Sequence, residues 1–135
     1  MKDFLKLDHI GYAVNNIATT ARRYIENGWN LSETYEEVSQ NSKIAFLTKD
    51  GFPKIELVES EKEGTSPIRN ILKQSGVSPY HLCYEVDNIY KTMESLYEDG
   101  FVPLFMPLPS VSMQGRMICY LRNLEVGTIE LVSRI

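Results

Sequence analysis

The chain has 135 residues, and its 14 Lys and Arg against 18 Asp and Glu leave a net charge of −4 at pH 7. That balance excludes a protein built to cover nucleic-acid phosphates, because such proteins concentrate positive charge. With 43% hydrophobic and 24% charged residues, the composition is that of a globular protein and not of a disordered one. The length predicts a single domain over residues 1–135.

Membrane insertion and a disulfide scaffold are also disfavoured. No apolar run approaches the roughly 18 residues of a membrane span, and the N-terminal MKDFLKLDHI lacks the apolar stretch of a secretory signal. Cys83 and Cys119 are far apart and form no C-x-x-C motif. We therefore expect a reduced, cytoplasmic protein with no membrane partner, in which both cysteines are small buried hydrophobes.

An internal repeat organises the chain. When the sequence is shifted by 81 − 9 = 72 residues, residues 8–29 fall on residues 80–101. Histidine then meets histidine, Asn-Ile meets Asn-Ile, and a glycine followed by an aromatic residue closes both segments. The tetrapeptide IELV also occurs twice, at 55–58 and at 129–132. Two copies indicate a duplicated module and not a solenoid.

The first module reads as strand, helix and three strands. It begins with a strand at 6–14, where the side chains of one face alternate with those of the other. Asn15 or Asn16 is expected to cap the following helix, and Gly28 to end it in the left-handed conformation. Three further strands complete the module, and they are expected at about 30–38, 43–49 and 53–59.

The second module repeats this order after a linker helix, which Ser66-Pro67 begins at about 67–75 and Gly76 ends. A strand is expected at 80–86 and a helix between Asn88 and Gly100. Three strands should follow at about 102–106, 115–121 and 127–133, the first of them interrupted by prolines. The apolar stripes of both module helices should be core; they consist of Ile17, Ala21, Tyr24 and Ile25 in one and Ile89, Met93, Leu96 and Tyr97 in the other.

The fold class predicted by this order is α+β. Module 1 covers about 5–60, the linker helix about 66–76 and module 2 about 79–133. The two βαβββ modules should pair into an incomplete, cleft-forming β-barrel with the helices outside.

Two histidines and two glutamates recur at matching places. His9 and His81, the only histidines, occupy the same strand position, while Glu56 and Glu130 both lie in the repeated IELV. One such residue on a strand is ordinarily structural or solvated, but the recurrence of all four favours a shared role. Two imidazoles and two carboxylates suit a divalent metal and leave two positions for water or a chelating substrate. If both modules form one curved sheet, the four side chains can converge on one ion.

Other polar residues have weaker claims to a role. Arg116 is a candidate ligand for a substrate carboxylate or phosphate, with an ordinary surface arginine as the alternative. Five glutamates are expected to be solvated surface charge; they are Glu36, Glu37, Glu59, Glu61 and Glu63.

Four segments resemble the vicinal oxygen chelate superfamily, which groups glyoxalases, bleomycin-resistance proteins and extradiol dioxygenases. They are LDHIGYAV, KIELVES, SPYHLCYEV and GTIELV, and the resemblance covers about residues 5–133. Within the superfamily, IELVESEKEGTSPIRNIL and the strand YHLCYEVDNI are most similar to methylmalonyl-CoA epimerases and glyoxalase-I-like proteins.

The resemblance implies that His9, Glu56, His81 and Glu130 bind one divalent ion (Ni, Co, Zn or Mn) and that Glu130 also transfers a proton. Epimerases carry a second acid in the loop between the second and third strands. This chain has Gln40 or Asn41 near that place, so Gln40 is at most a substrate contact, and Glu36 or Glu37 would have to supply the acid.

The implied function is a metal-dependent epimerase, isomerase or lyase that abstracts a proton α to a carbonyl. Its substrate would be an acyl-CoA or a thiol-conjugated 2-oxoaldehyde, and the enzyme is expected to be a homodimer. One alternative is a glyoxalase I (lactoylglutathione lyase)-like enzyme. Another is a non-catalytic, drug-sequestering protein of the bleomycin-resistance type, although those proteins commonly lack the metal ligands. A ring-cleaving dioxygenase is disfavoured by the fourth ligand, Glu56, and by the short chain.

Overall fold

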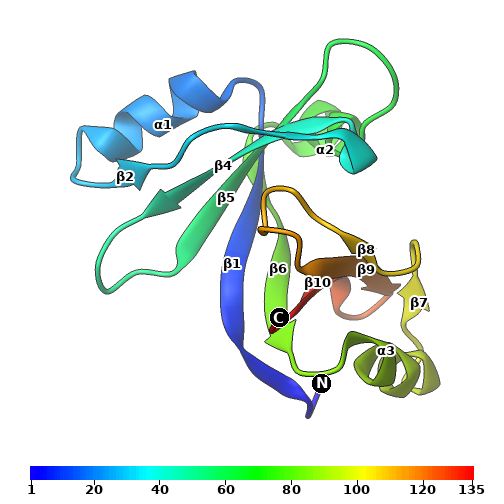
Figure 1. Ribbon diagram of the computed structural model, residues 1–135. Helices are drawn as coiled ribbons and strands as arrows, with labels where there is room; N and C mark the ends of the chain where they lie inside the picture. The colour runs from blue at the N-terminus through cyan, green and yellow to red at the C-terminus, as the bar shows by residue number, and fades with distance from the viewer. The chain divides into compact units, whose positions relative to one another are not determined.

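The computed structural model describes all residues, 1–135, as two compact units (Figure 1). The N-terminal unit is His9–Tyr80, and the C-terminal unit is Met1–Asp8 together with His81–Ile135. The first strand therefore contributes to both units. None of the helices has the length and apolar character needed to cross a membrane.

The N-terminal unit contains the strand path β2-β4-β5-β1, with β3 paired to the side of β4. Strands β1 and β5 are parallel, and β4 runs antiparallel to β5. Helix α1 provides the crossover, and α2 follows β5. The elements are β1 (Phe4–Val14), α1 (Ile17–Ile25), β2 (Asn30–Leu31), β3 (Tyr35–Glu37), the 3₁₀ helix η1 (Val38–Gln40), β4 (Ser42–Thr48), β5 (Lys54–Ser60) and α2 (Ile68–Ser75).

The C-terminal unit repeats this topology with the path β6-β10-β9-β7 and β8 beside β9. Strand β10 is parallel to β6 and antiparallel to β9, as β5 is to β1 and β4. The elements are β6 (Ser78–Val86), α3 (Ile89–Glu98), β7 (Val102–Pro103), β8 (Leu108–Pro109), β9 (Met117–Asn123) and β10 (Gly127–Ser133). The ten strands belong to one sheet whose path ends at β2 and β7, so the sheet is open. The α+β class and the duplicated βαβββ order are confirmed.

The predicted strands that follow each helix are wrong in detail. The segment 30–38 holds two short strands and a 3₁₀ turn, because Ser32 exchanges hydrogen bonds with Phe46 through its own N–H and hydroxyl and ends the regular ladder. The segment 102–106 keeps only the two residues of β7, and β8 was not predicted. Prolines in this stretch remove ladder donors and confine pairing to short edge strands.

Local signals at the helix ends are confirmed. Asn16 Oδ1 accepts the Thr19 N–H at 2.9 Å, and Asn88 Oδ1 accepts the Lys91 N–H at 3.1 Å. The glycines that follow α1 and α3, Gly28 and Gly100, both have φ of +91°, which a residue without Cβ adopts at least cost. Both helices therefore begin at an asparagine cap and are followed by a glycine with positive φ.

The apolar stripes of the two helices form the two cores, with one residue in each stripe predicted wrongly. Val14, Ile17, Ala21, Ala45, Leu47, Ile55 and Leu57 form the core under α1, and α3 covers a matching cluster that includes Met93 and Leu96. Ile25 and Tyr97, predicted to be core, are 49% and 65% exposed. Each lies eight residues after the first buried residue of its helix, which at about 100° per residue turns it roughly 80° away from the buried face.

Glu59 holds the start of α1 against β5. Its Oε1 accepts the backbone N–H of Ile17, the first residue of the helix, at 2.7 Å. A carboxylate there pairs an otherwise unsatisfied donor and interacts favourably with the helix dipole. Glu59, predicted to be solvated, is half-buried instead.

Replacing this carboxylate should therefore weaken the fold. We expect Glu59→Ala to lower the free energy of unfolding by about 1 kcal/mol, the usual cost of losing a helix N-terminal acceptor. Urea denaturation followed by circular dichroism measures it. Glu63→Ala, in an exposed loop, is the matched control. Equal midpoints for the two variants would contradict the capping role.

Candidate metal centre

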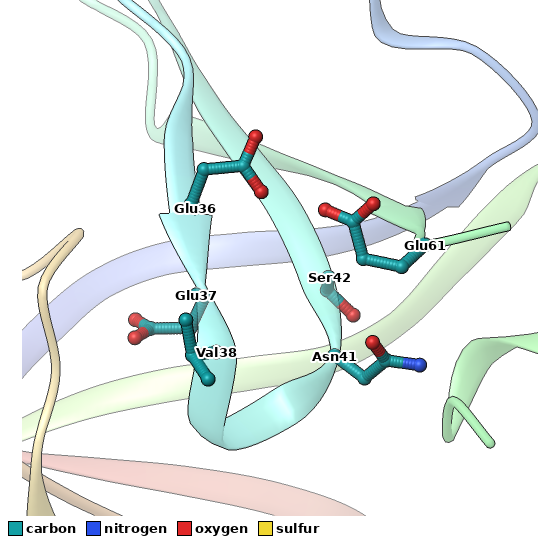
Figure 2. Close-up of a pocket in the computed structure, with 6 residues that line it drawn as sticks. All are labelled: Glu36, Glu37, Val38, Asn41, Ser42 and Glu61. Carbon is teal, nitrogen blue, oxygen red and sulfur yellow. The ribbon is translucent and has the colours of Figure 1, made fainter. Parts of the chain in front are cut away.

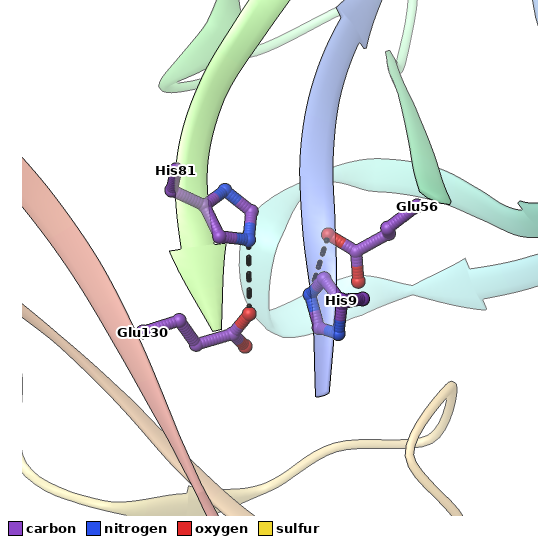
Figure 3. Close-up of side chains that lie close together, drawn as sticks. All are labelled: His9, Glu56, His81 and Glu130. Atoms are coloured by element: carbon purple, nitrogen blue, oxygen red, sulfur yellow. Dashed lines mark hydrogen bonds and ion pairs between the residues drawn. The ribbon is translucent and has the colours of Figure 1, made fainter. Parts of the chain in front are cut away.

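The N-terminal unit buries one histidine against one glutamate. His9 Nε2 lies 3.5 Å from Glu56 Oε1, and the two side chains are 0% and 2% exposed (Figure 3). Glu56 lies opposite Gly11 in the parallel register of β1 and β5, so no side chain separates it from the imidazole two residues away. Phe46, opposite Glu56 on β4, packs its ring edge-on to His9 at 5.8 Å.

The C-terminal unit builds the same arrangement from the second module. His81 Nε2 lies 3.0 Å from Glu130 Oε1, and these side chains are also 0% and 2% exposed (Figure 3). Tyr120 lies opposite Glu130 on β9, and its ring meets the His81 ring edge-on at 5.2 Å. The duplication has therefore preserved a histidine, a glutamate and an aromatic ring in one geometric relation.

The donor atoms of both pairs fit a divalent cation. Burying an ionised carboxylate is costly unless an opposite charge or hydrogen bonds compensate it. With a neutral imidazole, the ligand form of histidine, each pair carries a charge of −1 that a bound cation would balance. Imidazole nitrogen with carboxylate oxygen is a ligand set that Zn, Ni, Co and Mn accept.

Glu37 is a buried acid that the sequence interpretation missed. It was predicted to be solvated with Glu36, but Glu37 is 1% exposed whereas Glu36 is exposed. The two side chains leave β3 in opposite directions (Figure 2). Register places Glu37 opposite Ser42 and Ser42 opposite Ser60, which lies on the same face of β5 as Glu56. The alternation within Tyr35-Glu36-Glu37 was the signal that distinguishes the two acids.

A small acidic cavity lies beside Glu37. Its volume is about 190 Å³, and its lining residues are Glu36, Glu37, Val38, Asn41, Ser42 and Glu61 (Figure 2). A hydrogen bond with Glu36 raises the pKa of Glu61, and burial and the Glu36 charge raise it further, while Lys43 lowers it. Two carboxylates, Glu36 and Glu61, thus lie close together at the edge of this cavity.

The weaker sequence candidates have structural partners. Gln40 is half-buried at the end of η1, and its carbonyl accepts the Ser42 hydroxyl at 2.9 Å. The Asn41 amide donates to the carbonyls of Glu63 and Thr65 at 2.7 and 3.1 Å, which ties η1 to the loop after β5.

Arg116 lies in the C-terminal unit next to two carboxylates. Its guanidinium nitrogens are 3.4 Å from Asp8 and 3.5 Å from Glu85, and its side chain is 22% exposed. A further bond from Nε to the Met113 carbonyl, 3.3 Å long, fixes the guanidinium over the turn that precedes β9. The positive charge of Arg116 is thus compensated within its own unit.

Comparisons with known proteins agree with the resemblance noted in the sequence. Residues 8–120 match the model of the glyoxalase/bleomycin resistance protein/dioxygenase superfamily. An ethylmalonyl-CoA/methylmalonyl-CoA epimerase from Cereibacter sphaeroides is 28% identical over 118 residues, which are 86% of this chain and 87% of that protein.

Two solved structures illustrate the similarity of fold. A hypothetical protein from Bacillus halodurans is 29% identical with a TM-score of 0.83, over 96% of this chain and 94% of its own. A variant of Streptomyces coelicolor methylmalonyl-CoA epimerase in complex with 2-nitronate-propionyl-CoA is 23% identical with a TM-score of 0.82, over 96% and 97% of the two chains.

Both cysteines are buried and free, as predicted. Burial, followed by the nearby charge of Glu130, raises the pKa of Cys119 to about 12 from 9.0. Because the thiolate is the reactive form, we expect no rapid reaction of the native protein with Ellman's reagent at pH 8. Denaturation should release two thiols. A native thiol that reacts as fast as free cysteine would contradict this environment.

Proposed function

Because the chain belongs to the glyoxalase/bleomycin resistance protein/dioxygenase superfamily, we propose that it is a metal-dependent epimerase of an acyl-CoA of the methylmalonyl-CoA type. The observation that carries the proposal is the duplicated, fully buried His–Glu pair. The named activity of the Cereibacter sphaeroides relative supports the choice of reaction.

The proposed ligands of one divalent ion are His9 and Glu56 from one module and His81 and Glu130 from the other. Such an ion would act as a Lewis acid, stabilising negative charge on the carbonyl oxygen next to the reacting carbon. The aromatic rings of Phe46 and Tyr120 restrict the orientation of the two imidazoles, so each Nε2 stays directed at its carboxylate.

Epimerisation requires one group to remove the α-proton and a second to return a proton to the opposite face. We assign Glu130 as the first, on the family resemblance, and Glu37 as the second. Glu130 takes the α-proton, and a protonated Glu37 donates its own proton to the other face. In the reverse direction the two carboxyl groups exchange roles. Burial of Glu37 on the face of Glu56 supports this assignment, since it restores the acid that Gln40 cannot supply.

A glyoxalase I-like lyase is the second candidate, because it also needs an acid–base group and a polarised carbonyl. The burial of a third carboxyl group, Glu37, favours the epimerase, in which two separate proton positions are required. Sequestration of a drug would require neither the buried Glu37 nor two buried His–Glu pairs.

Metal content tests whether both modules supply one site. We expect one ion per chain in the wild type and almost none in His9→Ala or in His81→Ala, although the two histidines belong to different modules. Inductively coupled plasma mass spectrometry after removal of excess metal measures it. Glu94→Gln, on the exposed surface of α3, is the control. If each histidine variant kept half of the metal, the modules would bind separate ions.

Solvent exchange of the α-hydrogen tests the two acids. In deuterated water, Glu37→Gln should still exchange the α-hydrogen of one epimer of methylmalonyl-CoA but not that of the other epimer. Glu130→Gln should show the opposite preference. Epimerisation should fall at least about 10²-fold in both variants, the lower range for loss of a general base or acid. Proton NMR resolves both processes.

The exposed neighbour supplies the control for this experiment. Glu36→Gln should epimerise at a rate close to that of the wild type. Unchanged epimerisation by Glu37→Gln would remove Glu37 from the reaction. The lyase would be favoured if the metal-loaded wild type does not epimerise methylmalonyl-CoA but converts the hemithioacetal of methylglyoxal and glutathione.

A further inference from the structure

The two modules differ at one charged position beside the repeated His–Glu pairs. Lys54 precedes Glu56 by two residues, and Thr128 precedes Glu130 by two residues. Strand alternation places Lys54 on the same face of β5 as Glu56. At this position the duplicated framework therefore carries a positive charge in the N-terminal module only.

Lys54 lies next to His9 across the sheet. The two residues are direct partners in the parallel register of β1 and β5, so their side chains leave the sheet on the same side. The Lys54 ammonium lies 5.2 Å from the centre of the Phe46 ring, the ring that also packs edge-on against the His9 imidazole. One aromatic side chain thus links the cation to the buried His9–Glu56 pair.

The Lys54 ammonium has no carboxylate within ion-pair distance. It contacts the face of the Phe46 ring instead. Arg116, by comparison, pairs with two carboxylates, and the Lys49 ammonium donates to the Asn27 carbonyl at 2.9 Å. A cation–π contact orients an ammonium without neutralising it. The half-buried Lys54 is therefore positioned and still able to bind an anion.

We propose that Lys54 binds the free carboxylate of a dicarboxylic acyl thioester and so selects such substrates over monocarboxylic ones. This inference rests on the proposed epimerase function. The two buried glutamates would already balance the charge of a divalent ion, so a substrate carboxylate needs a further cation to offset its own charge. Adjacent strands are about 4.8 Å apart, so Lys54 lies close to His9. If the substrate binds beside His9, Lys54 can contact a group that adjoins the reacting carbon. The CoA phosphates, at the far end of the pantetheine arm, are the other anionic groups of the substrate.

Ligand binding tests this assignment without requiring turnover. By isothermal titration calorimetry, the wild type should bind methylmalonyl-CoA more tightly than propionyl-CoA, which lacks the carboxylate. Lys54→Met keeps an apolar chain over Phe46 and removes the charge. It should weaken methylmalonyl-CoA binding roughly 10- to 100-fold, the range for a hydrogen bond to a charged group, and leave propionyl-CoA unchanged. Lys54→Arg should restore part of the loss.

Lys43→Met is the matched control, because Lys43 is also half-buried but lies on the opposite face of β4 from Phe46. It should bind both ligands as the wild type does. Thermal unfolding of each variant verifies that the fold is intact.

Methylmalonyl-pantetheine separates the two possible anions. If Lys54 binds the carboxylate, Lys54→Met should weaken the binding of methylmalonyl-pantetheine as much as the binding of methylmalonyl-CoA. A loss confined to the CoA ligands would assign Lys54 to a phosphate and overturn the proposal, as would unchanged binding of methylmalonyl-CoA. If the wild type distinguishes the two acyl groups through Lys54 but catalyses no epimerisation, the proposed function fails and the specificity assignment stands.

Discussion

The free-energy cost of burying two carboxylates is the constraint on which the candidate metal centre depends. Glu56 and Glu130 have almost no contact with solvent, and each lies against a histidine that is equally buried. A protein selected only for stability would gain more from apolar side chains at these positions, because a charged group in the interior seldom recovers its full desolvation cost. The sheet instead buries such a carboxylate twice, in equivalent positions, and the proposed cation would supply the compensating charge.

Duplication explains how such a site arises from simple parts. Each module provides a parallel strand pair, β1 with β5 and β6 with β10, that places a histidine diagonally across from a glutamate. An aromatic residue on the third strand then fills the space beside the imidazole. One module offers only two ligands, too few for a tightly bound ion. In the proposed site, two modules would offer four and leave positions open, as a catalytic metal site requires.

Short-range chemistry explains why much of the fold, and the place of each histidine beside a glutamate, could be predicted from the sequence. The caps Asn16 and Asn88, the repeated IELV and the two histidines are all visible in the linear pattern, and the helices and long strands follow from them. The short strands after each helix could not be predicted, because contacts such as that of Ser32 with Phe46 depend on strands distant in sequence. Charge alone predicts an exposed Glu37, whereas alternation along the three-residue strand β3 turns its side chain away from that of Glu36 and into the protein.

In the proposed function, chemical specificity depends on departures from internal symmetry. A symmetric site would treat the two ends of a substrate alike, whereas an epimerase would have to hold a thioester and a carboxylate in different places. The N-terminal module carries two charged residues that are absent at the corresponding positions of the C-terminal module. Lys54 corresponds to Thr128, and the segment that holds Glu37 corresponds to the proline-containing stretch around β8. Because the His–Glu pairs are equivalent, groups outside them would set the direction in which a substrate binds. In the proposed enzyme the two pairs would thus supply the metal ligands, while Lys54 and Glu37 would determine which acyl group is bound and in which orientation.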